Sequence, residues 1–238
     1  MTVQSRRTQA LRRRLRPSSE GECEELVQKM YYSVNRSTHG GNQWESNTGE
    51  VLPQSVTFLL RVVGPIGPSD VFLDVGSGLG NIVCQVLLQT EAQKAIGVEK
   101  QRAVLELGQS IVVRWQQNHQ RLKNAEFHQD DVRLYAQDLP EYALDATIIY
   151  SNNVRFHANA NHALFQLASS LPKARLLITA VATCPRHRAK CQNPLCATWK
   201  RTDIVQTAVS WMNSLVQRVS ESGLAGFSVE NVIDFIKC

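Results

Sequence analysis

The sequence predicts an α/β fold: a doubly wound, mostly parallel sheet preceded by a small N-terminal helical subdomain. From residue 71 onward, short apolar segments typical of buried strands alternate with segments of helical periodicity, which is the pattern of βαβ units. A glycine-rich segment, residues 76–80, joins the first such strand to the first such helix. The 238 residues, 43% of them hydrophobic, suffice for a substantial core, and no run of eighteen apolar residues predicts a membrane span.

The basic charge of the chain is concentrated at its N-terminus. The net charge is +5, but the first sixteen residues contain no acidic residue and six arginines, which are Arg6, Arg7, Arg12, Arg13, Arg14 and Arg16. The remainder carries 20 basic and 21 acidic residues and is nearly neutral. The N-terminal segment is rich in Arg, Ser, Thr and Gln, a composition that cannot bury enough apolar surface to become ordered. We therefore expect residues 1–18 to form a flexible basic arm. Its arginines are suited to binding the phosphate backbone of DNA.

Residues 19–69 are expected to form the small helical subdomain. Glutamates crowd its first turn, and apolar residues recur at helical spacing from Cys23 to Val34. Residues 35–49 predict a loop, and loops of this length are usually functional or mobile. A second helix is predicted after this loop, with Pro53 near its first turn and a run of glycines and prolines at its end.

Residues 70–238 are expected to form the α/β domain, in which a parallel sheet is covered on both faces. The predicted strands are residues 71–75, 95–98, 125–128, 146–150 and 176–181, and the predicted helices are residues 81–89, 101–122 and 159–171. Helical spacing of apolar residues also predicts a helix over residues 203–222, with Thr202 as its cap and Gly223 at its end. A last strand is expected over residues 227–236.

The segment that follows the first predicted strand carries the strongest functional motif of the chain. It opens a helix, and glycines at such a position let the backbone approach a ligand at the helix N-terminus. The candidate binding residues are Asp74, Gly76, Ser77, Gly78, Gly80 and Asn81. A tight turn that only packs a strand against a helix is the alternative interpretation. Acidic residues at the strand ends favour a ligand.

Three acidic residues lie near the carboxyl ends of successive predicted strands. Asp74 is suited to accept hydrogen bonds from a ligand ammonium group. Glu99, beside Lys100, is placed to bind ribose hydroxyls, and Asp131, beside Asp130, is placed to accept from an adenine amino group, although a single acid there is commonly only a turn cap. S-adenosylmethionine carries these groups, so the pattern predicts an S-adenosylmethionine site. A nicotinamide-binding fold and a degenerate pocket are the alternatives.

These motifs resemble those of the Dot-type (disruptor of telomeric silencing) histone-lysine methyltransferases. Four segments are similar to the family's motifs and occur in the same order, namely Thr48-Gly49-Glu50, the glycine loop of residues 74–81, Gly97-Val98-Glu99-Lys100, and Asn152-Asn153 with Phe156. The resemblance covers about residues 47–181. The chain departs from the family's motifs at Thr48, Asn81, Val154 and Arg155.

The resemblance implies a class I methyltransferase Rossmann-like fold and S-adenosylmethionine-dependent methylation of a lysine in a core histone within the nucleosome. It implies that Asn152 holds the methionine part of the cofactor or the incoming amine, that Phe156 walls the lysine channel, and that Gly49 and Glu50 form a lid over the methionine end. The amine must be neutral to react, and an apolar channel lowers the lysine pKa from about 10.4 by desolvation.

The sequence leaves alternatives open for the cellular location of the protein and for its function. The resemblance favours the nucleus, but an arginine-rich, acid-free N-terminus is also typical of a mitochondrial presequence. The functional alternatives are an RNA or small-molecule methyltransferase of class I and a cofactor-binding module without catalysis.

The cysteines raise the question of a metal site. Zinc accepts the donor set of Cys184, His187, Cys191 and Cys196. The spacing is looser than in zinc knuckles and basic residues are interleaved, so we expect an exposed basic loop with incidental thiols and no metal. Cys23 and Cys84 fall on apolar faces and are expected to be buried. Without a secretory signal, a reducing compartment and no disulfides are expected.

Overall fold

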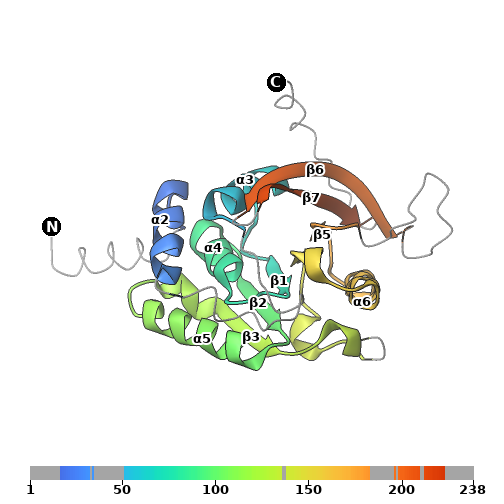
Figure 1. The fold of residues 1–238 in the computed structure, drawn as a ribbon, viewed down its shortest axis with the longest axis horizontal. Coiled ribbons are helices and arrows are strands. Elements are labelled where there is room, and N and C mark those ends of the chain that lie inside the picture. The colour runs from blue at the N-terminus through green and yellow to red at the C-terminus, as the bar shows by residue number, and fades with distance from the viewer. Residues whose placement is uncertain are drawn as a thin grey trace, which may run out of the picture.

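The computed structural model describes residues 17–32, 34, 51–135, 138–182, 196, 198–209 and 212–222, and it confirms the α/β prediction. Over these residues a seven-stranded sheet has the order β3-β2-β1-β4-β5-β7-β6, with helices on both faces (Figure 1). Strands β1 to β5 are parallel, whereas β7 is antiparallel to both β5 and β6. No helix in the described part is long and apolar enough to cross a membrane.

The predicted elements up to residue 181 are present with small shifts of their ends, except that the helix predicted over residues 101–122 ends at Gln116 and is followed by a 3-10 turn over Gln120–Asn124. The strands are β1 (Val71–Val75), β2 (Lys94–Glu99), β3 (Ala125–Gln129), β4 (Ile148–Ser151), β5 (Leu176–Thr179), β6 (Trp199–Val209) and β7 (Met212–Ser222). The helices are α2 (Glu20–Tyr31), α3 (Pro53–Val63), α4 (Asn81–Gln89), α5 (Arg102–Gln116) and α6 (Ala158–Ser170), with 3-10 turns η3 (Gln120–Asn124), η4 (Val132–Leu134), η5 (Glu141–Ala143) and η6 (Asn153–Arg155).

The helix predicted over residues 203–222 is wrong, because this segment forms most of β6 and all of β7. β7 pairs with β5, for example Val219 with Ile178, and thereby covers an edge that parallel pairing leaves open. The β6–β7 register shifts between Arg201 and Asp203 and again before Val209. Between these two shifts, from Asp203 to Thr207, the register is regular although the apolar residues keep helix-like spacing, so pairing with other strands overrides the local pattern.

Several predictions concern residues that the structure does not describe. They are the six arginines of the arm, the loop of residues 35–49 with Gly49, Glu50 beside it, the sulfur and imidazole donors at Cys184, His187 and Cys191, and the last strand over residues 227–236. Cys196 is described and packs against the core, and the described residues contain no group of three or more potential metal ligands.

The sheet is buried on both faces, because side chains alternate along each strand. In β1, Phe72 faces one core with residues of α3 and α4, whereas Leu73 faces the other with residues of α6. A third cluster joins α2 to α4 and α5, so that α2 lies outside the helices that cover the sheet (Figure 1). Cys23 and Cys84 are buried in this cluster, as predicted.

A buried ion pair ties together the starts of three strands. Asp70, just before β1, accepts hydrogen bonds from Nε and Nη2 of Arg175, both at 3.0 Å, from Oγ1 of Thr147 at 2.8 Å, and from the Gly67 N–H at 2.9 Å. Burial alone would raise the pKa of Asp70, but these hydrogen bonds outweigh it and hold the pKa below its ordinary value. The pair therefore fixes the amino-terminal edge of the parallel sheet.

Replacing Arg175 with methionine should lower the free energy of unfolding by about 2–4 kcal/mol, because Asp70 would stay buried without its cation. Since the pKa of Asp70 is lowered in the folded state, its contribution is present above the ordinary carboxyl pKa and is lost as pH falls through the folded-state value. Urea denaturation at pH 7 and at successively lower pH measures both effects. Lys173→Met, which breaks an exposed pair with Asp145, should leave the midpoint unchanged.

Candidate active site

A cavity lies at the carboxyl-terminal edge of the parallel strands. Strand order reverses between β1 and β4, which is where ligands bind in sheets of this type. The glycine loop after β1, the end of β2, the segment after β3 and the segment after β4 all contribute to its wall. Ten of the predicted site residues line it, namely Asp74, Gly76, Ser77, Gly78, Asn81, Glu99, Lys100, Asp131, Asn152 and Phe156. The topology thus brings together residues that are up to 82 positions apart, from Asp74 to Phe156.

Backbone hydrogen bonds hold the glycine loop against β2. The N–H groups of Gly76 and Ser77 both donate to the carbonyl oxygen of Val98, at 2.8 and 3.0 Å. Gly76 has a φ of 83°, and a Cβ added there would lie 3.0 Å from the ring of Phe156. Only glycine therefore fits between the loop backbone and this ring, and the loop presents backbone to the cavity.

Two carboxylates are buried beside this loop. Glu99 is 5% exposed; its Oε2 accepts from the Gly78 N–H at 3.0 Å and its Oε1 from the Gln101 N–H at 2.9 Å. Burial raises the pKa of Glu99, although these hydrogen bonds oppose the shift. Asp74 is 1% exposed, and burial together with the charge of Glu99 raises its pKa well above the ordinary value. The cavity therefore favours a ligand that carries positive charge.

The acidic residues after β3 are engaged with protein groups. Asp131 caps η4, and its carboxylate accepts from the backbone N–H and the guanidinium of Arg133. These hydrogen bonds hold the pKa of Asp131 below its ordinary value. Asp130 accepts from the hydroxyl of Tyr142 at 3.2 Å and from the Asp131 N–H at 2.8 Å. Asp131 is thus a turn cap, as the alternative interpretation predicts, and it also lines the cavity.

The two adjacent asparagines after β4 have different environments. Asn152 lines the cavity, whereas Asn153 is fully buried and does not. The amide of Asn153 accepts from the Val181 N–H at 2.8 Å and donates to the Val181 carbonyl at 3.0 Å and to Asn161 at 2.6 Å. Asn161 in turn donates to the carbonyl of Phe156 at 3.0 Å. Asn153 therefore anchors the segment that presents Asn152 and Phe156.

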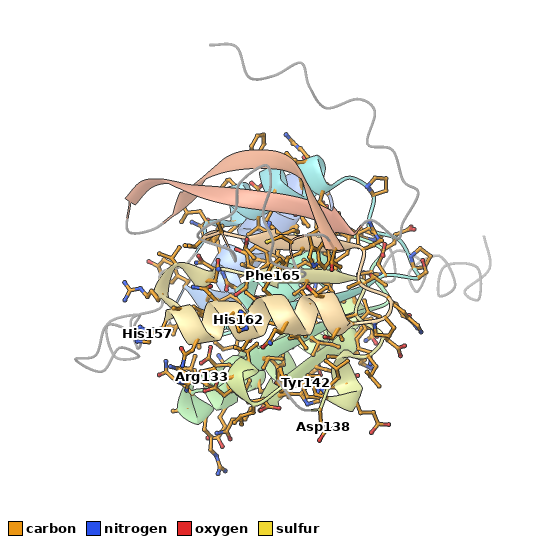
Figure 2. The ribbon with its side chains drawn as sticks, turned by 90° about the vertical axis from the view of Figure 1, so that its right-hand side faces the viewer. Arg133, Asp138, Tyr142, His157, His162 and Phe165 are labelled. Atoms are coloured by element: carbon orange, nitrogen blue, oxygen red, sulfur yellow. The ribbon has the colours of Figure 1, made fainter. Side chains whose placement is uncertain are left out.

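One predicted residue described by the structure does not line the cavity, and several residues that line it were not predicted. Gly80 is the N-cap of α4; it lies against the ring of Phe127 and does not line the cavity. Asp130, Arg133, Tyr150 and His157 line it without having been predicted. Figure 2 shows Arg133 and His157 toward the same side of the molecule, at the N-terminal end of α6, while Asp138 lies toward the other side. The acidic pair at residues 130 and 131 was the available signal for Asp130.

A family model described as histone methylation protein DOT1 matches residues 40–218 of the chain. The chain belongs to the DOT1 family. The resemblance inferred from the motifs is thus confirmed. The matched region includes the described cavity, β6 and the first part of β7, so the family assignment extends beyond the motifs that predicted it.

Curated relatives agree with the DOT1 assignment. A Caenorhabditis elegans protein named histone-lysine N-methyltransferase, H3 lysine-79 specific, is 27% identical over 113 residues, which is 46% of this chain and 12% of that protein. A Mycosarcoma maydis protein of the same name is 40% identical over 65 residues, which is 27% of this chain and 8% of that protein. The chain therefore spans only a small part of these relatives.

Solved structures share the fold at low sequence identity. A Pyrococcus horikoshii protein provisionally assigned as an RNA methyltransferase has a TM-score of 0.54 at 12% identity, covering 85% of this chain and 98% of that one. Geranyl diphosphate methyltransferase in complex with SAM has a TM-score of 0.51 at 14% identity, covering 71% of this chain and 84% of that one. The DOT1-family chain thus has the predicted class I methyltransferase Rossmann-like fold.

Proposed function

We propose that the cavity binds S-adenosylmethionine and that the chain transfers its methyl group to the side-chain amine of a lysine in a core histone within the nucleosome. The observation that carries the proposal is the pair of buried carboxylates, Asp74 and Glu99, beside a glycine loop in a chain of the DOT1 family. The names of the two curated relatives support histone lysine as the acceptor.

The residues of the cavity fit this cofactor. A cationic group compensates the two carboxylates whose charged forms are disfavoured by burial, so Asp74 would accept hydrogen bonds from the cofactor's ammonium. Each oxygen of Glu99 receives one backbone N–H and retains acceptor capacity for a ribose hydroxyl. The loop residues that line the cavity would lie along the cofactor, with Lys100 beside Glu99; these are Gly76, Ser77, Gly78 and Asn81, whereas Gly80 lies outside the cavity wall.

The adenine end would lie at the segment after β3. Asp131 keeps acceptor capacity beyond its bonds to Arg133, and we assign it to the adenine amino group, as the motif analysis suggested. Arg133 keeps this carboxylate ionised and fixed in orientation, which makes it a constant acceptor at neutral pH. Asp130, on the same cavity wall, is the neighbouring candidate for the same contact.

The acceptor end would lie where the segment after β4 meets the glycine loop. Asn152 would orient the incoming amine or the methionine part through its amide, and Phe156, whose ring lies against Gly76, would form an apolar wall. Such a wall lowers the pKa of a lysine by desolvating its charged form, so that no strong base is required. The bound cofactor supplies an electrophilic methyl group. Gly49 and Glu50 are assigned to a lid over the methionine end.

The remaining assignments concern organisation and location. We propose residues 1–18 as a basic arm, residues 19–69 as a helical subdomain with the lid loop, and residues 70–238 as the methyltransferase domain. The arm would bind the DNA phosphates of the nucleosome. A nuclear location accords with a histone acceptor, and the mitochondrion is the less favoured alternative. Fluorescent tagging at the C-terminus distinguishes the two.

Binding and transfer assays on the full chain test the proposed function. Calorimetry with S-adenosylhomocysteine should detect binding, and methyl-labelled S-adenosylmethionine should label histone in nucleosomes more than free histones or RNA. Gly78→Arg is the negative control, because Gly78 lines the cavity with a φ of 56°. Absence of binding would refute the cofactor site; label on RNA alone would refute the histone acceptor; binding without transfer to any substrate would refute catalysis.

Replacing the six arginines of the arm with glutamine should weaken nucleosome binding and reduce its salt dependence, because each phosphate contact contributes about 0.9 to the slope of log affinity against log salt. Affinity for S-adenosylhomocysteine should not change. Nucleosome gel shifts at several salt concentrations, with calorimetry on the same variant, measure both. An equal loss of both affinities would mean that the arm is part of the cofactor-binding fold.

A further inference from the structure

The last residue of α2 contacts the backbone of the glycine loop. Tyr31 is 3% exposed, and its hydroxyl donates to the carbonyl oxygen of Leu79 at 3.2 Å. Leu79 lies between Gly78 and Gly80 and lines the cavity. A helix of the N-terminal subdomain is therefore hydrogen-bonded to the loop that surrounds the proposed cofactor.

The same carbonyl is enclosed from the opposite side by α5. A Cβ added to Gly108 would lie 2.5 Å from the Leu79 oxygen, so the absence of a side chain at Gly108 leaves room for this carbonyl. The hydroxyl of Tyr31 is itself held by α4, because it lies 3.3 Å from Sγ of Cys84. The Leu79 carbonyl thus contacts α2 and α5, while α4 holds the hydroxyl that donates to it. Together the three helices fix the orientation of the peptide after Leu79 and of the neighbouring glycine backbone.

The hydroxyl of Tyr31 is not needed to dock α2. The N–H of Ser18, before α2, donates to the carbonyl of Leu88 in α4 at 2.7 Å. Cys23 and Val27 of α2 are buried in the cluster shared with α4 and α5. The helix would remain in place without the hydroxyl, whereas the Leu79 carbonyl would lose its donor.

We infer that Tyr31 is a positioning residue for cofactor binding: it sets the orientation of the glycine loop and couples the docking of α2 to the affinity of the cavity. The inference rests on the proposed function, since it takes the cavity as the S-adenosylmethionine site. Because coupling between two equilibria is reciprocal, the cofactor must also stabilise the docked position of α2.

Tyr31→Phe keeps the ring and removes only the hydroxyl, so it should weaken S-adenosylhomocysteine binding roughly three- to tenfold, as expected for one hydrogen bond. The matched control is Ser169→Ala, which removes the partner of the Trp199 Nε1–H on the other face of the sheet. Because each variant removes one hydrogen bond, Ser169→Ala should lower the melting temperature about as much as Tyr31→Phe does. It should not change the affinity for S-adenosylhomocysteine. Calorimetry and thermal melts on both full-length variants measure the difference.

Cysteine alkylation tests the coupling in the opposite direction. Cys23 lies on the buried face of α2, and burial raises the pKa of its thiol to about 12. The thiol therefore reacts only when α2 moves away from α4 and α5. Saturating S-adenosylhomocysteine should slow alkylation of the Cys23 peptide, followed by mass spectrometry, in the wild type. In Tyr31→Phe this protection should be reduced, while alkylation without ligand changes little.

The possible failures are distinguishable. If the wild type and Tyr31→Phe bind S-adenosylhomocysteine equally, or if the ligand does not protect Cys23, the positioning role is refuted and the cofactor site stands. If the wild type binds no S-adenosylhomocysteine, the proposed function is refuted and this inference with it. If the expected shifts occur without transfer to nucleosomes, the positioning role is supported and only the proposed acceptor is refuted.

Discussion

Asp74→Asn should weaken S-adenosylmethionine binding about thirtyfold or more while raising the melting temperature of the ligand-free protein. The carboxylate is buried beside Glu99, and the cofactor's ammonium would be its compensating cation. Removing one partner of a buried charge pair typically costs about 2–5 kcal/mol of binding energy. Without the ligand, the same carboxylate is destabilising, because its charged form is desolvated and pairs with no cation among the residues that the structure describes.

The sign of the pH effect follows from the raised pKa of Asp74. The folded state binds the proton more tightly than the unfolded state, so the wild type loses stability as pH rises above the ordinary carboxyl pKa toward the folded-state value. The difference in melting temperature between Asp74→Asn and the wild type should therefore be absent at low pH and grow as pH rises. Thermal melts from pH 4 to pH 8 measure it.

Asp145→Asn provides a matched control for Asp74→Asn. Asp145 is an exposed acid that pairs with Lys173 away from the cavity, so its replacement should alter neither cofactor affinity nor the melting temperature. If Asp74→Asn bound S-adenosylmethionine as the wild type does, the ammonium contact assigned to Asp74 would be refuted. If its melting temperature fell, the carboxylate would have a stabilising partner in the ligand-free protein.

Gly80→Ala should lower the free energy of unfolding by about 2–5 kcal/mol. Gly80 has a φ of 81°, which disfavours any L side chain, and a new Cβ would lie 2.4 Å from Cε1 of Phe127. The backbone and the clash therefore contribute separately. Urea denaturation, monitored by circular dichroism, measures the total loss.

A second substitution separates these contributions. Adding Phe127→Leu to Gly80→Ala should recover the part of the loss that comes from the clash, since it shortens the side chain that the new Cβ meets. The remaining loss, about 1–2 kcal/mol, is the cost of the left-handed backbone at Gly80, which has a ψ of 22°. If Phe127→Leu recovered nothing, Phe127 would move aside without cost.

Local patterns predicted the central part of the fold well. β1 and α4 have the predicted bounds, because each begins and ends at residues with strong local preferences: an apolar strand, then glycines, then an apolar helix that is buried on all sides. The segment of residues 203–222 was not predictable in this way. Its pairing with β5 joins residues about forty positions apart, and this long-range pairing overrides the helix-like spacing of its apolar residues.

The candidate site was predictable where residue types carry the signal. Buried strands that end in acids and glycines indicated Asp74, Glu99 and the glycine loop, and all of these predicted residues except Gly80 line one cavity. The two asparagines after β4 were indistinguishable in the sequence, since both follow a strand. Their separate environments depend on Val181 and Asn161, which reach Asn153 through folding.

The amino-acid sequence by itself predicted the order of elements up to residue 181, the basic character of the N-terminus and the family, because periodicity, composition and motif spacing are properties of neighbouring residues. The bonds of Asp131 to Arg133, of Asp70 to Arg175 and of Tyr31 to Leu79 were not. Each requires a particular side-chain orientation, and the last two also require strands and helices distant in the chain to pack side by side. Folding alone sets those distances and the burial that shifts the carboxylate pKa values.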